Sequence, residues 1–166
     1  MSVVAVKVYD KEIIMSADSI IVHGDDKTPV GKGKIFEVNG MLIGTSGLAS
    51  EGVHMALFAE NHTPLTMDER ELTKWMHEFI TWRAKEFGAD PKGEYQNQYL
   101  IAYKGKVFMC NAGYIGEVTD FFAIGAGEKY ANAALYLGHS PAEAVKVACA
   151  LSCYVDEPII TKSIAK

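Results

Sequence analysis

The first two apolar segments of the chain constrain its fold more than any other feature, because neither has a polar face. Residues 3–8 (VVAVKV) and 12–17 (EIIMSA) flank the short turn YDK, which predicts an antiparallel hairpin. A strand with one face in water alternates apolar and polar residues, whereas a strand covered on both faces does not. The pattern therefore predicts a sheet that lies between two other layers.

A second hairpin is predicted around an Asn-Gly pair, which is the strongest short-range turn signal. The pair separates residues 34–38 (KIFEV) from residues 41–46 (MLIGTS). This turn places Lys34 opposite Thr45, and Gly47 lies just past the same end of the hairpin.

Helices and further strands are predicted from apolar spacing and from capping residues. Thr66 with Glu69 and Ser140 with Glu143 have the spacing of a capping box. We expect helices over residues 48–60, from 66 to a stop at Gly88, over 128–137 and from 140 onward, and strands over 99–110, 119–124 and 157–164. The last helix is apolar around most of its circumference, which predicts that it is buried. The order of strands, helices, strands and helices indicates an α+β fold in a single domain over residues 1–166.

Composition argues against several classes of function. The formal net charge is −5 without a run of Lys and Arg, so we expect no nucleic-acid partner. No apolar segment is long enough to span a membrane, and the first residues have the pattern of a strand instead of a secretory signal. The three cysteines are an odd, sparse set, which is typical of free thiols in a reducing compartment. We therefore expect a cytoplasmic protein with no membrane partner.

Neither a metal nor a cofactor is expected. Cys149 and Cys153 lie four residues apart on the expected last helix and could share a metal, but no nearby His or Cys pair completes such a site. Two small buried residues are the favoured interpretation. The five histidines show no metal or triad spacing.

The register of the first hairpin decides what lies beside Ser2. A three-residue loop pairs Ser2 with Asp18 across the open end of the hairpin, whereas a two-residue loop pairs it with Ser19. Lys34 also leads into an apolar strand, and a lysine among apolar neighbours needs a carboxylate partner. Asp18 is the candidate for that partner.

These residues together suggest a nucleophile at the start of the chain. Once Met1 is removed, the hydroxyl of Ser2 has its own base, the free α-amine, whose unperturbed pKa is about 7.7–8.0. A nearby Lys34 ammonium favours the attacking form of the nucleophile, and Asp18 keeps that ammonium charged. The backbone N–H of Gly47 could stabilise an oxyanion.

Three motifs resemble those of the N-terminal-nucleophile hydrolases, in particular the proteasome β subunits and HslV. Ser2, Asp18 and Lys34 follow one another at intervals of sixteen residues, as in the family, and SADS is similar to the family's Gly-Ala-Asp-Ser. TSGLAS resembles the turn that carries the family's oxyanion glycine, which corresponds to Gly47. FFAIGAGEKYANAAL is similar to the family's Ala-Ile-Gly-Ser-Gly segment and the helix after it. The resemblance covers residues 2–50 and 119–155.

The resemblance implies a four-layer αββα sandwich and a self-compartmentalising peptidase. It implies that Ser2, Asp18, Lys34 and Gly47 are catalytic. It also implies that the pocket for the substrate side chain is lined by Ile21, Thr45 and Ala49. The family forms stacked rings around a chamber, so it implies a homo-oligomeric double ring, a peptide or unfolded protein as substrate, and an ATP-dependent unfoldase as a possible partner.

The chain departs from the family at three places. Its nucleophile is Ser instead of Thr, and Ala126 stands where the family has a serine near the amine. The family's Asp-x-x-Ser is missing near the last helix, where Ala150 or a neighbouring residue occupies the place of the aspartate. Ser152 or Asp156 could replace it only if the backbone shifts.

Two other functions stay open: a small-molecule amidase on the same fold, and a non-catalytic ring that binds a partner. Each candidate residue also has a purely structural interpretation. Asp18 could be a strand-end turn residue. Lys34 could extend along apolar surface to solvent, and Gly47 could serve only a tight turn.

Overall fold

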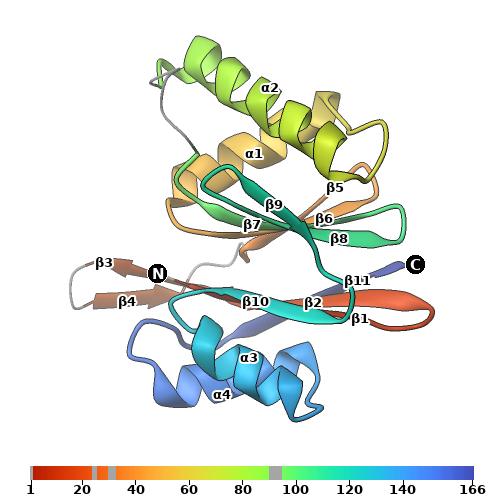
Figure 1. Ribbon diagram of the computed structural model, residues 1–166. Helices are drawn as coiled ribbons and strands as arrows, with labels where there is room; N and C mark the ends of the chain where they lie inside the picture. Colours follow the sequence, from red (N-terminus) through yellow and green to blue (C-terminus); the bar gives the residue numbers. More distant parts are fainter. Residues whose placement is uncertain (1, 24–25, 30–32, 90–94) are drawn as a thin grey trace.

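The computed structural model describes residues 2–23, 26–29, 33–89 and 95–166. Figure 1 shows four layers: the helices α1 and α2, a first sheet, a second sheet, and the helices α3 and α4. The expected α+β class and the four-layer αββα sandwich are confirmed.

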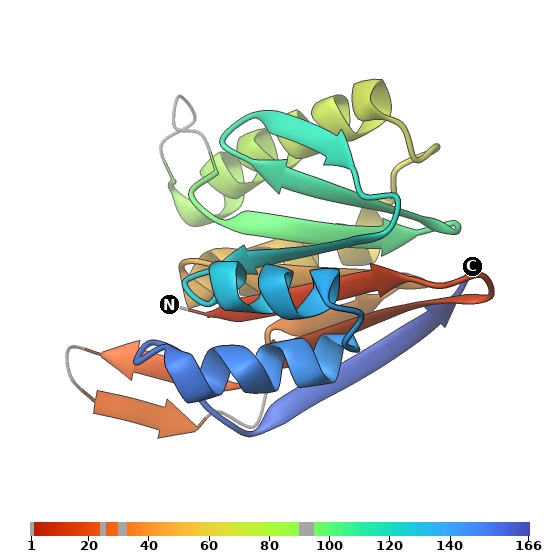
Figure 2. The same cartoon turned by 60° about the horizontal axis from the view of Figure 1, so that its bottom comes forward.

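One sheet contains the start of the chain. Its strand order is β10-β1-β2-β11, and each neighbouring pair is antiparallel. Its strands are β1 (Val3–Val8), β2 (Glu12–Asp18), β10 (Phe121–Gly125) and β11 (Ile159–Ala165). Because β1 is an inner strand, the segment after Ser2 is fixed on both sides. Figure 2 shows this sheet with α3 and α4 in front of it.

The other sheet has the strand order β5-β6-β7-β8-β9. Its strands are β5 (Ile35–Val38), β6 (Met41–Ser46), β7 (Gln98–Tyr103), β8 (Lys106–Asn111) and β9 (Tyr114–Glu117). The Asn-Gly turn is confirmed, since Asn39 and Gly40 both have positive φ and β5 pairs with β6 as expected. A separate ribbon of β3 (Ile20–His23) and β4 (Asp26–Pro29) was not predicted, because β4 is polar and exposed.

The register of the first hairpin differs from the expected one by one position. Val4 lies opposite Ala17, and the N–H of Tyr9 donates to the carbonyl of Glu12 at 2.8 Å, which leaves a two-residue loop. Val4 and Ala17 both face the apolar layer between the sheets. The three-residue loop would have paired Val4 with Ser16 instead, so the expected register is wrong and the alternative is correct.

The described part of the chain forms the helices α1 (Ala49–Asn61), α2 (Glu69–Phe87), α3 (Glu128–Tyr136) and α4 (Pro141–Leu151). The capping box of Ser140 and Glu143 is confirmed. The predicted box at Thr66 is wrong, because the carboxylate of Asp68 accepts the N–H of Glu71 and caps α2. The hydroxyl of Thr66 instead donates to that carboxylate.

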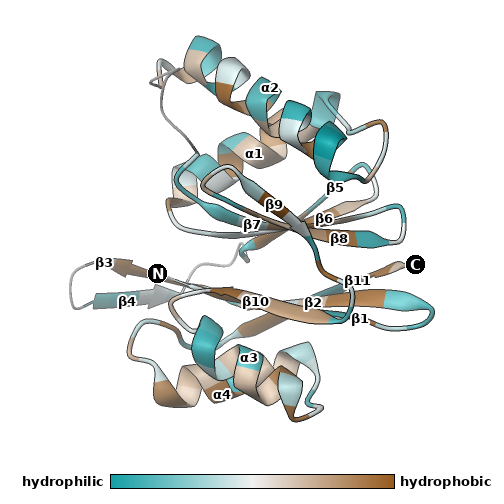
Figure 3. Ribbon diagram, viewed as in Figure 1, coloured by the Kyte–Doolittle hydropathy of each residue, from teal (hydrophilic) through white to brown (hydrophobic). Residues whose placement is uncertain are grey.

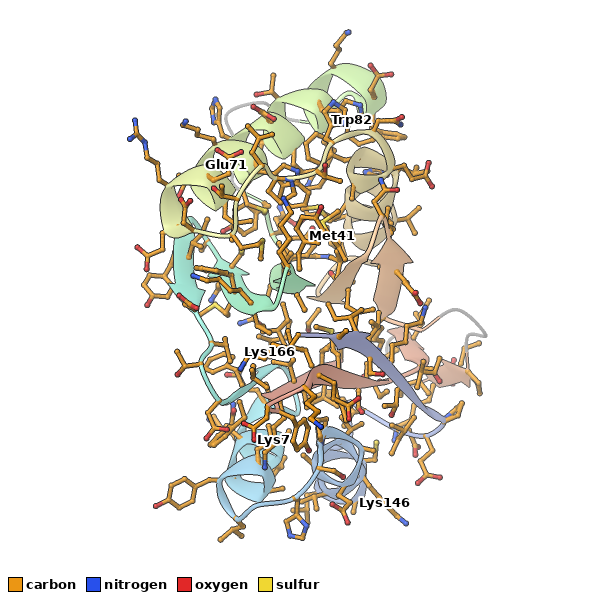
Figure 4. All side chains as sticks on the ribbon, turned by 90° about the vertical axis from the view of Figure 1, so that its right-hand side faces the viewer. Lys7, Met41, Glu71, Trp82, Lys146 and Lys166 are labelled. Atoms are coloured by element: carbon orange, nitrogen blue, oxygen red, sulfur yellow. The ribbon has the colours of Figure 1, made fainter. Side chains whose placement is uncertain are left out.

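Three apolar clusters join the four layers. In β1, Val4 and Val6 face the other sheet, whereas Val3 and Ala5 face α3 and α4. A third cluster lies between the helices α1 and α2 and the five-stranded sheet of β5 to β9, and it includes Met41 (Figure 4). Figure 3 shows the same division, with hydrophobic residues along β1 and β10 and hydrophilic residues on the outer side of α2. The two-sided pattern of the opening strands therefore predicted the layers correctly.

Two further expectations concern membranes and cysteines. In the described ranges, no helix is both long enough and apolar enough to cross a membrane. Cys110, Cys149 and Cys153 are free thiols. Cys153 lies beyond the end of α4 at Leu151 and is exposed, and Cys149 is half-buried. The expectations that these two cysteines share a helix and are both buried are therefore wrong.

Candidate active site

Asp18 and Lys34 form an ion pair at one end of the two sheets. Asp18 ends β2 and is fully buried, and Lys34 stands just before β5. The distance between Lys34 Nζ and Asp18 Oδ2 is 2.6 Å, and the lysine side chain is 12% exposed. The structure thus brings together two residues that the sequence separates by sixteen positions.

The same carboxylate holds the backbone beside Ser2. Asp18 Oδ1 accepts the N–H of Val3 at 2.8 Å, and the carbonyl of Ser2 accepts the N–H of Gly127 at 3.3 Å. Ser2 is 3% exposed. Asp18 therefore connects the ammonium of Lys34 to the peptide group that follows Ser2.

The cross-strand partner of Ser2 differs from the expected one. When the observed register is extended by two residues, Ser2 lies opposite Ser19 instead of Asp18. The side chain of Asp18 nevertheless reaches the first strand through Val3. Ser19 donates its hydroxyl to the carbonyl of Pro158 at 2.7 Å and so has another partner.

Burial opposes the charges of this pair. Burial raises the pKa of Asp18, and the nearby Lys34 ammonium partly offsets that rise. Burial likewise lowers the pKa of Lys34, and the carboxylate partly offsets that fall. A lysine whose pKa is lowered exchanges its proton nearer to neutral pH, which suits a group that tunes a nucleophile and its base.

Gly47 lies in a turn that Asn97 holds. The carboxamide of Asn97 accepts the N–H of Leu48 at 2.6 Å and donates to the Leu48 carbonyl and to Thr45 Oγ1, each at 2.9 Å. Gly47 has a φ of +138°, and a Cβ on it would overlap the Asn97 side chain. This turn requires glycine for structural reasons, whatever its N–H does chemically.

The Gly47 turn and the start of the chain meet at Gly125. A Cβ on Gly125 would overlap both the carbonyl of Ser2 and the hydroxyl of Ser46, and Gly125 has a φ of +95°. The N–H of Gly125 donates to Gln98 Oε1 at 2.9 Å. Ser2 and the residue before Gly47 therefore both lie against the face of Gly125 that a side chain would occupy.

The three residues expected to line a substrate pocket lie on different elements. Thr45 is buried in β6, and its N–H donates to the carbonyl of Lys34 at 2.9 Å. Ile21 is half-buried in β3, which begins two residues after Asp18, and Ala49 is exposed as the first residue of α1. The structure places Thr45 beside the ion pair.

The residues that stand where the family has polar groups near the amine do not take over that role. Ala126 is exposed and has no polar group to offer. Asp156 pairs with Lys27 at 3.1 Å, and the hydroxyl of Ser152 accepts the N–H of Tyr154 at 3.3 Å. In this structure, neither Asp156 nor Ser152 replaces the missing aspartate.

Sequence reasoning missed Asn97 and Gln98. They stand at the start of β7, where polar residues precede an apolar strand, and that pattern normally marks a strand end. Their partners are 27 to 52 residues away in the chain, so no local spacing indicates them. Among the residues that the structure describes, no group of three or more His, Cys, Asp or Glu side chains could hold a metal.

Several solved structures share this fold. Two structures of BPH from Thiobacillus denitrificans, one of them in complex with epoxomicin, are 20% identical to the chain, with TM-scores of 0.85 and 0.87. The matches cover 98% of this chain and 97–98% of theirs. Eukaryotic HslV from Trypanosoma brucei is 13% identical, with a TM-score of 0.75 over 99% of each chain. No protein-family model and no curated protein matches the chain. At these identities the likeness shows the fold, and at that level the expected similarity to HslV is confirmed.

Proposed function

We propose that this chain is a peptidase that hydrolyses peptide bonds with Ser2 as nucleophile, exposed by removal of Met1. The observation that carries the proposal is the position of Asp18. Its carboxylate binds the ammonium of Lys34 with one oxygen and the N–H next to Ser2 with the other. The fold shared with HslV supports the proposal, as does the complex of BPH with epoxomicin.

The mechanism uses the two groups of the terminal residue. The α-amine of Ser2 takes the proton of its hydroxyl as Oγ attacks the peptide carbonyl. The ammonium of Lys34 favours the neutral amine and the attacking oxygen, and Asp18 holds that ammonium in place. The N–H of Gly47 stabilises the tetrahedral oxyanion. The protonated amine then gives its proton to the leaving amine, and water hydrolyses the ester on Ser2 by the same steps.

The substrate, assembly and partners follow from the same proposal. The substrate is a peptide or unfolded protein, and Ile21, Thr45 and Ala49 contact its side chain beside the cleaved bond. The assembly is a homo-oligomeric double ring of single-domain chains over residues 1–166. An ATP-dependent unfoldase is the partner that would supply unfolded substrate.

One observation favours a second candidate, a ring that binds a partner without cleaving it. Ala126 cannot orient the α-amine, and Asp156 is engaged by Lys27. A site that lacks polar groups to orient the α-amine could keep its geometry and yet be inactive.

The experiment that separates the two candidates combines mass, cleavage and labelling. The purified protein should be one methionine lighter than the full sequence, because the small Ser2 side chain permits removal of Met1. It should cleave members of a peptide library and react with epoxomicin, and Ser2→Ala should abolish both. Retention of Met1, or a processed protein that neither cleaves nor reacts, would leave the binding ring. Cleavage of small amides but of no peptide would identify an amidase.

A further inference from the structure

The Asn97 side chain spans the turn that carries Gly47. Its carboxamide bonds to Thr45 on one side of Gly47 and to both backbone groups of Leu48 on the other. Both amide hydrogens donate, the oxygen accepts, and the residue is 1% exposed. Such a fully bonded, buried carboxamide has a single orientation, so it fixes the peptide group that follows Gly47 and ties it to the side chain of Thr45, two residues before Gly47.

A buried carboxylate fixes Asn97 in turn. Glu51 of α1 accepts the N–H of Asn97 at 2.9 Å and the hydroxyl of Tyr99 at 2.9 Å. The guanidinium of Arg83, from α2, pairs with the other oxygen of Glu51. Both α1 and α2 therefore contribute to the position of Asn97. Its backbone N–H binds Glu51 of α1, and its side chain binds the turn.

We propose that Asn97 is a positioning residue that aims the N–H of Gly47 at the oxyanion. The inference rests on the proposed function and adds a residue to it. A donor stabilises a developing charge only if its direction is set before the reaction. Gly47 has no side chain to restrict its own backbone, so the restriction has to come from a neighbour. Asn97 is the neighbour that bonds to both sides of the turn.

The test compares three variants of the processed protein. Asn97→Ala removes the bonds to the turn, and Asn97→Asp keeps the shape but turns the donor to Leu48 into an acceptor. Asn132→Ala is the matched control, because Asn132 also bonds two backbone groups, those of Ala123 at 2.9 and 3.1 Å, in the other sheet. We expect both Asn97 variants to lower kcat about 100-fold or more with KM within about twofold, and the control to leave kcat unchanged.

A second measurement does not depend on activity. Hydrogen exchange at the Leu48 amide should be slow in the wild type and in Asn132→Ala, and about tenfold faster or more in Asn97→Ala, which lacks the oxygen that accepts the Leu48 N–H. Unchanged kcat in the Asn97 variants of an active protein would overturn the inference and leave the proposed function intact. A wild type without peptidase activity would remove the proposed function, and the Asn97 inference with it. Exchange at Leu48 that stays slow in Asn97→Ala would overturn the inference whatever the activity.

Discussion

The carboxylate of Asp18 is fully buried against the ammonium of Lys34. Burying two charges costs free energy that their attraction only partly returns, and removing one partner leaves the other uncompensated. The directions of the two pKa shifts agree with this cost, since burial raises the pKa of Asp18 and lowers that of Lys34. The pair is therefore a poor source of stability, which agrees with the proposed role of Lys34 and Asp18 in the reaction.

Lys34→Met should destabilise the protein by about 3–5 kcal/mol at pH 7, because it leaves the Asp18 carboxylate buried without its cation. The double variant Lys34→Met/Asp18→Asn should recover most of this loss, since the amide oxygen still accepts the N–H of Val3. Urea denaturation measures both values. A double variant as unstable as the single one would show that packing, not charge, is lost.

The stability of Lys34→Met should also depend on pH in a defined direction. The folded pKa of Asp18 is raised above its ordinary value of 3.8, so the folded state holds the proton more tightly than the unfolded state does. Without Lys34 the folded pKa rises further. The contribution of Asp18 to the free energy of unfolding is thus favourable at acid pH. It is lost as the pH rises from about 4 through the folded pKa. Lys34→Met should approach wild-type stability near pH 4, whereas the double variant should lack this trend.

The sequence revealed only part of the site at this scale. The apolar neighbours of Lys34 predicted a carboxylate partner, and Asp18 is that partner. The equal spacing of Ser2, Asp18 and Lys34 pointed to the site only through the resemblance to the family, because the hairpin register that pairs Ser2 with Asp18 is wrong. Asn97 was not predicted, because its contacts depend on how the start of β7 packs against the end of β6. No rule of sequence spacing describes that packing.

The elements were predicted best where a turn or cap has a specific chemistry. The Asn-Gly turn and the Ser140 cap are correct because their side chains and φ angles allow few alternatives. The first hairpin has no glycine in its loop, so loop length stayed open and burial decided the register. The prediction that α4 is buried around most of its circumference is wrong, because its small alanines are apolar without requiring burial. Only one face of α4 is buried, and Leu151 is 60% exposed.

Ser140→Ala should lower the free energy of unfolding by about 1 kcal/mol, because it removes the oxygen that accepts the N–H of Glu143. Thr66→Ala is the comparison, since Asp68 and not Thr66 accepts the N–H of Glu71 in the first turn of α2. It should change stability by less than about 0.5 kcal/mol. Thermal and urea unfolding of the two variants give the ranking, and a larger loss for Thr66→Ala would contradict the observed cap.

The whole molecule leaves apolar side chains uncovered on two outer layers. Leu48, Val53 and Leu57 are 39–50% exposed along α1, and Tyr136 and Leu137 are more than 70% exposed at the end of α3. Such exposed apolar side chains are typical of surfaces that other chains cover. The sequence could not fix the number of subunits, because apolar patterning describes one chain and not the angle at which copies meet.

We expect the protein to be a homo-oligomer at micromolar concentration, with α1 among its contacts. Val53→Lys together with Leu57→Lys should lower the mass in light scattering without changing the circular dichroism, because charges cannot be buried at an apolar contact. Lys146→Glu on the exposed side of α4 is the control for a change of surface charge. A monomeric wild type would exclude the ring.

The position of β1 determines how the candidate site responds to thermal motion. Chain ends normally fray, and local opening there costs almost nothing. β1 is paired on both edges and covered on both faces, so the peptide beside Ser2 separates from Asp18 only when the sheet itself comes apart. The candidate nucleophile is thus held with the cooperativity of the global fold. Site and fold should be lost in one transition, with no state in which the fold survives and the site has frayed.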